Sequence, residues 1–201
     1  MVTAPDITDE ERLLMLGSFA VPTAQERAEL GTLARRPLDW PLVFGLAQIN
    51  ATAPLLCRSL ARAGLLDAVP AVVRDALVAV TDAVAAVNER RLAAAIELLE
   101  HFHRAGRDCV VLKGMLFGLE IYDDPAYKRM NDIDILIRLD DVPAACDIYR
   151  GLGLFGSTAV LGKEPKAKPK RSHHLPSFIS RDGALVVGTH WGLITPLAPY
   201  T

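Results

Sequence analysis

The sequence predicts an α+β fold, with an N-terminal helical bundle followed by a small mixed sheet with flanking helices. Two patterns support this prediction. Residues 1–104 repeat apolar side chains at helical spacing, whereas residues 105–201 contain short β-branched runs and one alternating strand. A chain of 201 residues is long enough for two small domains. We therefore expect a helical domain at 1–104 and an α/β core at 105–201.

Capping residues mark the first helices. Thr8 or Asp9 can cap a helix that runs through Leu16. Thr23 and Glu26 have the spacing of a capping box, which opens a second helix. Further helices are expected at 40–51, at 53–65 and from Pro70 onward.

The segment after Pro70 predicts one long helix that reaches about residue 104. Its apolar residues recur in steps of three and four, but the phase slips across residues 88–91. A straight helix of this length would measure about 50 Å at about 1.5 Å per residue, more than the roughly 43 Å diameter expected of a compact chain. We therefore expect a bend or a projecting helix.

The second half changes to strand patterns. Residues 109–112 are a short β-branched run, which is typical of a buried strand. Isoleucines alternate with other residues from Ile133 to Ile137, which is strand periodicity. The remaining elements expected are helices at 115–122 and 142–150, and a hairpin of 177–180 with 184–190.

Composition and charge exclude several classes. The formal net charge is −2, so the chain as a whole does not attract nucleic acid or an anionic membrane. The longest apolar stretch is too short for a membrane span, and the N-terminus is acidic where a signal peptide would be basic. We expect a soluble, cytoplasmic protein whose three cysteines are reduced.

Asp132 and Asp134 are the strongest candidate site. Residues two apart on a strand face the same side, so these carboxylates can converge on one cation. Like charges on one face repel, and a divalent cation such as Mg²⁺ would compensate them. The alternative is a solvated strand face.

Cationic residues near this pair strengthen the metal interpretation. Lys113 and Gly114 follow one predicted strand and precede a helix, where backbone N–H groups can approach a phosphate. Arg129 lies three residues before Asp132. A basic segment, which could neutralise a triphosphate, contains Lys163, Lys166, Lys168, Lys170 and Arg171.

The glycines Gly151, Gly153 and Gly156 match the dinucleotide pattern G-x-G-x-x-G. That fingerprint must follow a strand and open a helix, whereas here it closes a predicted helix. We interpret these glycines as a helix C-cap and turn.

The order of these motifs resembles the uncharacterised nucleotidyltransferases of the polymerase-beta-like superfamily. The resemblance covers about residues 38–191. Its motifs are Val111-Leu112-Lys113-Gly114, Tyr122, Arg129, the run 132–137, the run 173–178 and His190-Trp191, with Trp40, 53–56 and 92–99 upstream.

The resemblance implies a minimal nucleotidyltransferase palm. Gly114 would lie at the phosphate-binding turn, and Asp132 and Asp134 would bind Mg²⁺ or Mn²⁺. The implied reaction moves a nucleoside monophosphate from an NTP to an acceptor hydroxyl of a small molecule, peptide or nucleic acid. The phosphates would contact Lys113, Arg129, Lys168, Lys170 and Arg171.

The chain departs from the family at Gly188, where a third carboxylate is usual. His190 follows two residues later and could act as a ligand or base, or could pack beside Trp191. Family members commonly continue past this point, so we expect part of the acceptor pocket to be missing. Two alternatives stay open: a catalytically degenerate member that binds nucleotide or a partner, and a purely structural or interaction protein.

Overall fold

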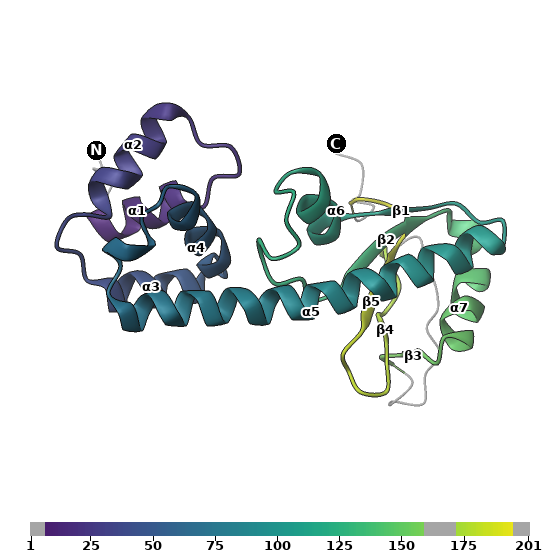
Figure 1. Ribbon diagram of the computed structural model, residues 1–201. Helices are drawn as coiled ribbons and strands as arrows, with labels where there is room; N and C mark the ends of the chain where they lie inside the picture. Colours follow the sequence, from purple (N-terminus) through teal and green to yellow (C-terminus); the bar gives the residue numbers. More distant parts are fainter. Residues whose placement is uncertain (1–6, 159–171, 195–201) are drawn as a thin grey trace, which may run out of the picture. The chain divides into compact units, whose positions relative to one another are not determined.

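The computed structural model describes residues 7–158 and 172–194, and in them it confirms the α+β class, with helices preceding a mixed sheet (Figure 1). The helices are α1 (Asp9–Gly17), α2 (Ala24–Leu33), α3 (Trp40–Ile49), α4 (Ala53–Arg62), α5 (Ala71–Arg104), α6 (Lys113–Glu120) and α7 (Val142–Gly151), with 3-10 turns at Leu66–Ala68 and Leu139–Asp141. The strands are β1 (Cys109–Val111), β2 (Ile133–Ile137), β3 (Phe155–Gly156), β4 (Phe178–Ile179) and β5 (Val186–His190).

The chain packs into two compact units. The first comprises residues 1–88 and 118–129, and the second comprises residues 89–117 and 130–201. The division falls inside α5, so this helix contributes to both units. The end of α5 at Arg104 marks the change from helices to strands.

The first unit contains two capping boxes, of which the sequence predicts the one at Thr23, while at Thr8 it predicts only a cap. The Thr8 side chain accepts from the backbone N–H of Glu11, whose carboxylate accepts from the Thr8 N–H in return. Thr23 and Glu26 repeat this arrangement at the start of α2. The core of this unit is built from leucines and small residues, including Leu13, Leu16, Leu30, Val43, Leu56, Leu60 and Leu77.

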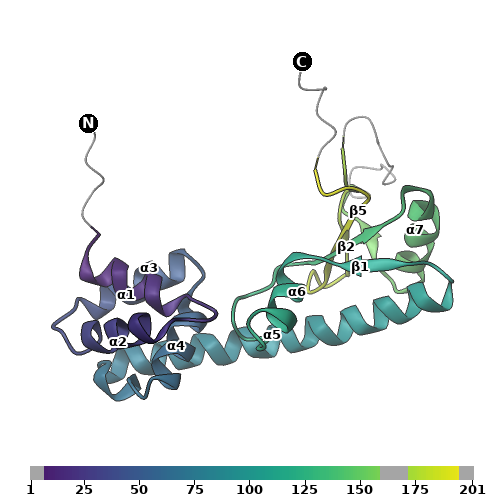
Figure 2. The same cartoon turned by 90° about the horizontal axis from the view of Figure 1, so that it is seen from above.

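The phase slip in the sequence is the point at which α5 passes from one core to the other. Leu77 packs in the first unit, whereas Leu98 and Phe102 pack in the second. Between them lies Asn88, which is fully buried and donates through Nδ2 to the carbonyls of Pro125 and Lys128. The helix continues without interruption through this point (Figure 2).

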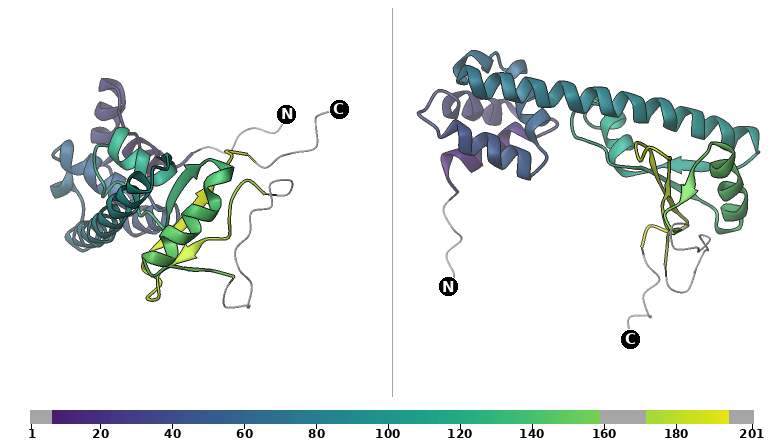
Figure 3. Two further views of the ribbon diagram at one scale, coloured as in Figure 1. Left: turned by 90° about the vertical axis from the view of Figure 1, so that its right-hand side faces the viewer. Right: turned by 90° about the horizontal axis from the view of Figure 1, so that it is seen from below.

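The second unit contains a five-stranded sheet in the order β1-β2-β5-β4-β3. The β2–β5 pair is parallel, and the other three pairs are antiparallel. Ile133, Ile135 and Ile137 point into a core shared with α5 and α7, and α7 lies along the sheet (Figure 3). The alternation that predicts β2 thus sends its isoleucines to one face and leaves Asp134 to the other.

Short strands and turns make up the rest of the second unit. β4 and β5 form the expected hairpin, with Gly183 at φ 70° in its turn. Strand β3 was not anticipated, because two residues give no periodicity to detect. Gly153 has φ 76° just after α7, which agrees with a helix C-terminal turn rather than a dinucleotide loop.

The three cysteines are free, and no described helix combines the length and apolarity that a membrane crossing requires.

Asn88 provides a test of the first unit. We expect Asn88→Ala to lower the free energy of unfolding by about 2 kcal/mol, because two carbonyls of the 118–129 segment lose a buried donor. Asn50→Ala is the control, since Asn50 is exposed and its side chain donates to the local Leu46 carbonyl, so the change in the free energy of unfolding should stay within about 0.5 kcal/mol. Urea unfolding measures both changes, and equal effects would contradict this role of Asn88.

Candidate active site

Asp134 is a buried carboxylate at the centre of the second unit, with 5% of its surface exposed. The Lys113 ammonium lies 2.8 Å from its Oδ2, and His190 Nε2 lies 2.7 Å from its Oδ1. Lys113 Nζ and His190 Nε2 are 3.5 Å apart. Because Nε2 faces a carboxylate oxygen, we assign it the ring proton, so that it donates to Asp134.

The β1–β2 pairing brings Lys113 to Asp134. Val111 is opposite Ile135, and the N–H of Leu112 donates to the Asp134 carbonyl at 2.9 Å. The chain then turns sharply into α6. The left-handed φ at this turn belongs to Lys113 itself, at 51°, and not to Gly114. A non-glycine residue in this conformation stores strain, which is common at binding sites.

The parallel β2–β5 pairing brings His190 to the same face. Gly188 is the register partner of Asp134, and His190 is the partner of Leu136. A Cβ atom on Gly188 would lie 2.5 Å from Asp134 Oδ1. Gly188, where the family usually has a third carboxylate, is therefore adjacent to Asp134. Because glycine has no side chain, the Asp134 carboxylate can occupy this space.

The opposite face of β5 is tied to α7 by a contact that the sequence did not reveal. Tyr149 Oη and Thr189 Oγ1 are 2.6 Å apart and buried. Burial raises the pKa of the Tyr149 hydroxyl, so it stays protonated and can donate. Thr189 lies between Gly188 and His190, and this bond fixes the strand on which both are carried. In the sequence, only the alternating pattern of β5 could indicate that the Thr189 side chain points into the core.

Asp132 lies just before β2 and is accessible to solvent. The pKa of its carboxyl is raised, first by partial removal from water and second by the negative charge of Asp134. The neighbouring Lys113 and His190 act in the opposite sense but do not cancel the rise in the pKa of Asp132. Asp132 and Asp134 thus form an acidic pair whose repulsion the described residues compensate only in part.

Two more histidines adjoin His190. The rings of His173 and His174 each lie 5.6 Å from the His190 ring, centre to centre. The segment is held against β5, because Leu175 N–H donates to the Thr189 carbonyl. The pKa of His173 is lowered, first by desolvation and then by the neighbouring histidines and Lys113. The motif at 173–178 therefore belongs to the surroundings of Asp134.

The structure does not test the placement of four other predicted site residues at this cluster. Arg129 belongs to the first unit, where it lines a cavity of about 490 Å³ with Val84 and Val87 among others. Its predicted phosphate contact stays a prediction. Lys168, Lys170 and Arg171 lie outside the described residues.

Asp132 and Asp134 are the candidate ligands for a divalent cation. Among the described residues, no group of three or more histidine, cysteine, aspartate or glutamate side chains is arranged to hold a metal. Asp132 and Asp134 supply two carboxylates, which is what a protein commonly offers Mg²⁺ when substrate phosphates complete the coordination. The residues present therefore fit a cation that arrives with a phosphate ligand.

Comparisons with known proteins give one match. Neither the curated proteins nor the solved structures contain a significant match to this chain. The sequence profile described as "uncharacterised nucleotidyltransferase" matches residues 36–201, which include Lys113, Asp132, Asp134 and His190. Because this match spans most of the sequence, the chain belongs to the uncharacterised nucleotidyltransferase family, and nucleotidyl transfer is its general class of activity.

Proposed function

We propose that this protein moves a nucleoside monophosphate from an NTP to an acceptor hydroxyl and releases pyrophosphate, with Mg²⁺ or Mn²⁺ as the cofactor. The observation that supports this proposal best is the cluster around Asp134. Two carboxylates, one ammonium group and one imidazole from three separate chain segments meet there. Two carboxylates can hold a divalent cation, and a neighbouring ammonium group can contact the phosphates of a triphosphate bound to that cation.

Asp132 and Asp134 would hold the cation, which would neutralise phosphate charge during the displacement. Lys113 has a second task. In the structure its ammonium lies 2.8 Å from Asp134 Oδ2, while 58% of its side chain is exposed. A flexible, exposed ammonium can turn from Asp134 to a phosphate oxygen. Lys113 therefore serves as the counter-ion of Asp134 before binding and of the triphosphate afterwards.

His190 is the proposed base. Its Nε2–H donates to Asp134, so in the neutral ring the lone pair is on Nδ1. A carboxylate that orients an imidazole in this way also stabilises the imidazolium formed when the ring takes a proton. His190 would accept the proton of the acceptor hydroxyl, a task that Gly188 cannot perform.

A second candidate function is nucleotide binding without catalysis. Gly188 supports this alternative, since it lies opposite Asp134 and contributes no third carboxylate. In this case Lys113 and the acidic pair would bind the nucleotide, and no pyrophosphate would be released.

Pyrophosphate release with each NTP, a divalent cation and candidate acceptors tests the proposal. Asp132→Asn and Asp134→Asn should each reduce the rate by about 100-fold or more. Each removes a carboxylate that would hold the cation, and the cation would stabilise the charge of the transition state. The matched control is Asp140→Asn, which changes an exposed aspartate of the same unit and should leave the rate unchanged. Release that survives Asp134→Asn would overturn the assignment.

Without metal, Asp134→Asn and Asp132→Asn should change the free energy of unfolding in different ways. Asp134→Asn should lower the free energy of unfolding by about 2 kcal/mol, less than a fully buried pair because Lys113 is largely exposed. Asp132→Asn should leave stability unchanged or raise it. A raised carboxyl pKa means that the folded state binds more protons, so wild-type stability falls as pH rises from the ordinary carboxyl range to the raised value.

Thermal unfolding across that pH range measures this contrast. The fall attributed to Asp132 should be absent in Asp132→Asn. A large loss of stability in Asp132→Asn would contradict the repulsion inferred between the two carboxylates.

Gly188 distinguishes the two candidate functions. Gly188→Glu adds the missing carboxylate but must displace Asp134 Oδ1, because even a Cβ would lie 2.5 Å from it. If His190 is the base, we expect Gly188→Glu and its uncharged control Gly188→Gln to reduce pyrophosphate release alike. Activity that appears only with Gly188→Glu in an inactive protein would favour the degenerate binding function.

A further inference from the structure

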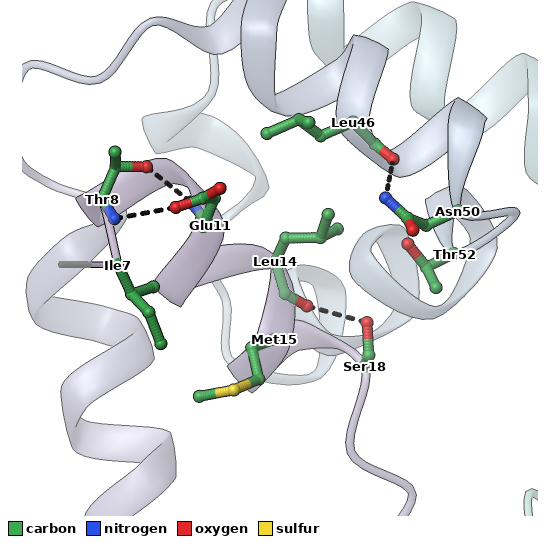
Figure 4. Close-up of a pocket in the computed structure, with 9 residues that line it drawn as sticks. All are labelled: Ile7, Thr8, Glu11, Leu14, Met15, Ser18, Leu46, Asn50 and Thr52. Atoms are coloured by element: carbon green, nitrogen blue, oxygen red, sulfur yellow. Dashed lines mark hydrogen bonds between the residues drawn. The ribbon is translucent and has the colours of Figure 1, made fainter. Parts of the chain in front are cut away.

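A cavity of about 680 Å³ lies beside α1 and α3 in the first unit (Figure 4). Its polar side chains already have partners: Thr8 and Glu11 bond to each other, Ser18 donates to the Leu14 carbonyl, and Asn50 donates to the Leu46 carbonyl (Figure 4). Because these bonds satisfy the polar side chains, the cavity walls give no reason to expect a polar ligand.

In the second unit, strand β5 loses its regular pairing on one side just before His190. Phe178 is opposite Val187 in the β4–β5 ladder, and His174 is opposite His190 further along the same two segments. These two pairs are four residues apart on the β4 side but only three apart on β5. An extra residue of this kind is a β-bulge, which interrupts the ladder and leaves a residue unpaired.

The bulge faces Gly188. The N–H of Leu175 donates to the Thr189 carbonyl on one side of the bulge, so Pro176 and Ser177 together lie opposite Gly188. Proline has no N–H to donate, and glycine adopts a wider range of backbone conformations than any other residue. Regular pairing at Gly188 is therefore limited to its β2 side. The imidazole two residues later depends on this weakly held stretch of strand.

A side-chain bond holds β5 directly after the bulge. Tyr149 Oη and Thr189 Oγ1 are 2.6 Å apart, and both side chains are fully buried. Tyr149 is itself fixed by aromatic packing, since its ring centre lies 4.7 Å from that of Phe178 and 6.1 Å from that of Phe102. Because Thr189 precedes His190, a directional bond to its side chain restricts the backbone that carries the imidazole.

The contact of His190 with Asp134 tolerates little movement of that backbone. Nε2 of His190 lies 2.7 Å from Asp134 Oδ1, in a cluster that also contains the Lys113 ammonium. A displacement of the ring by about 1 Å away from the carboxylate would take this pair beyond hydrogen-bond distance.

We propose that Tyr149 is a positioning residue for His190. Its bond to Thr189 holds β5 at the bulge and thereby keeps the imidazole on Asp134. Tyr149 acts from the core face of the sheet and does not touch substrate. The effect of Tyr149 on the rate rests on the proposed function, in which His190 is the base, whereas its effect on the contact between His190 and Asp134 does not.

Nuclear magnetic resonance of the full chain, with isotope-labelled histidine, tests this contact without an activity assay. The ring-nitrogen chemical shifts of His190, identified with His190→Gln, report whether Nε2–H is held on Asp134. In Tyr149→Phe these shifts should move from the wild-type values toward those of His103, which is exposed. Thr189→Val should cause the same movement, whereas Thr189→Ser keeps the hydroxyl and should retain the wild-type shifts.

A double variant separates position from stability. Tyr149→Phe and Thr189→Val each leave one buried hydroxyl without its partner, so each should lower the melting temperature. The double variant removes both hydroxyls, and its melting temperature should return toward that of the wild type. Its His190 shifts should remain displaced, because the bond is still missing. Val142→Ala is the control, since it weakens the same core without removing the bond and should keep the wild-type shifts.

Pyrophosphate release gives the second readout. Tyr149→Phe should lower kcat by about tenfold and leave KM for the NTP unchanged, because the base is displaced while the phosphate contacts remain. Tyr127→Phe, which changes a buried tyrosine of the first unit, should leave the rate unchanged.

The two readouts fail separately. A wild type that releases no pyrophosphate would contradict the proposed function and leave the resonance test of Tyr149 in force. Wild-type His190 shifts in Tyr149→Phe, or shifts that recover together with stability in the double variant, would overturn the positioning role.

Discussion

A carboxylate removed from water must find cationic or hydrogen-bonding partners, and the arrangement of the second unit follows from this requirement at Asp134. The antiparallel β1–β2 pair supplies Lys113, and the parallel β2–β5 pair supplies His190. Gly188 leaves room for the carboxylate between them. Under the proposed function, these two contacts place an exchangeable counter-ion and an oriented imidazole around one acid.

Contacts made by α5 organise each of the two units separately. Within the second unit, the C-terminal part of α5 and helix α7 cover the isoleucine face of β2, so the acidic face is the one left for a ligand. Within the first unit, Asn88 fastens the 118–129 segment to α5. Arg58 departs from this pattern, since its buried Nη1 makes no hydrogen bond among the described residues and lies in ion-pair range of Asp124, at 3.6 Å from Oδ2.

Local patterns predicted most of the fold. Capping boxes and the alternation of β2 depend on residues close in sequence, so Thr23, Ile135 and Asp134 could be placed without tertiary information. The partners of Asp134 could not, because the contacts with Lys113 and His190 depend on strand order and register. Strand β3 was too short to detect, and the left-handed φ fell on Lys113 where a glycine would be expected. The bond between Tyr149 and Thr189 joins residues 40 positions apart, and no spacing rule reveals it.

We propose that Asp132 and Asp134 form a cation site that nucleotide phosphates complete. Electron paramagnetic resonance of Mn²⁺, recorded with and without a non-hydrolysable NTP analogue, distinguishes such a site from one built by protein side chains alone. Because the described residues contain no group of three or more histidine, cysteine, aspartate or glutamate side chains that could hold a metal, Mn²⁺ should bind tightly only when the analogue is present, and Asp134→Asn should abolish that binding. Tight Mn²⁺ binding without nucleotide, or binding that Asp134→Asn leaves unchanged, would rule this site out.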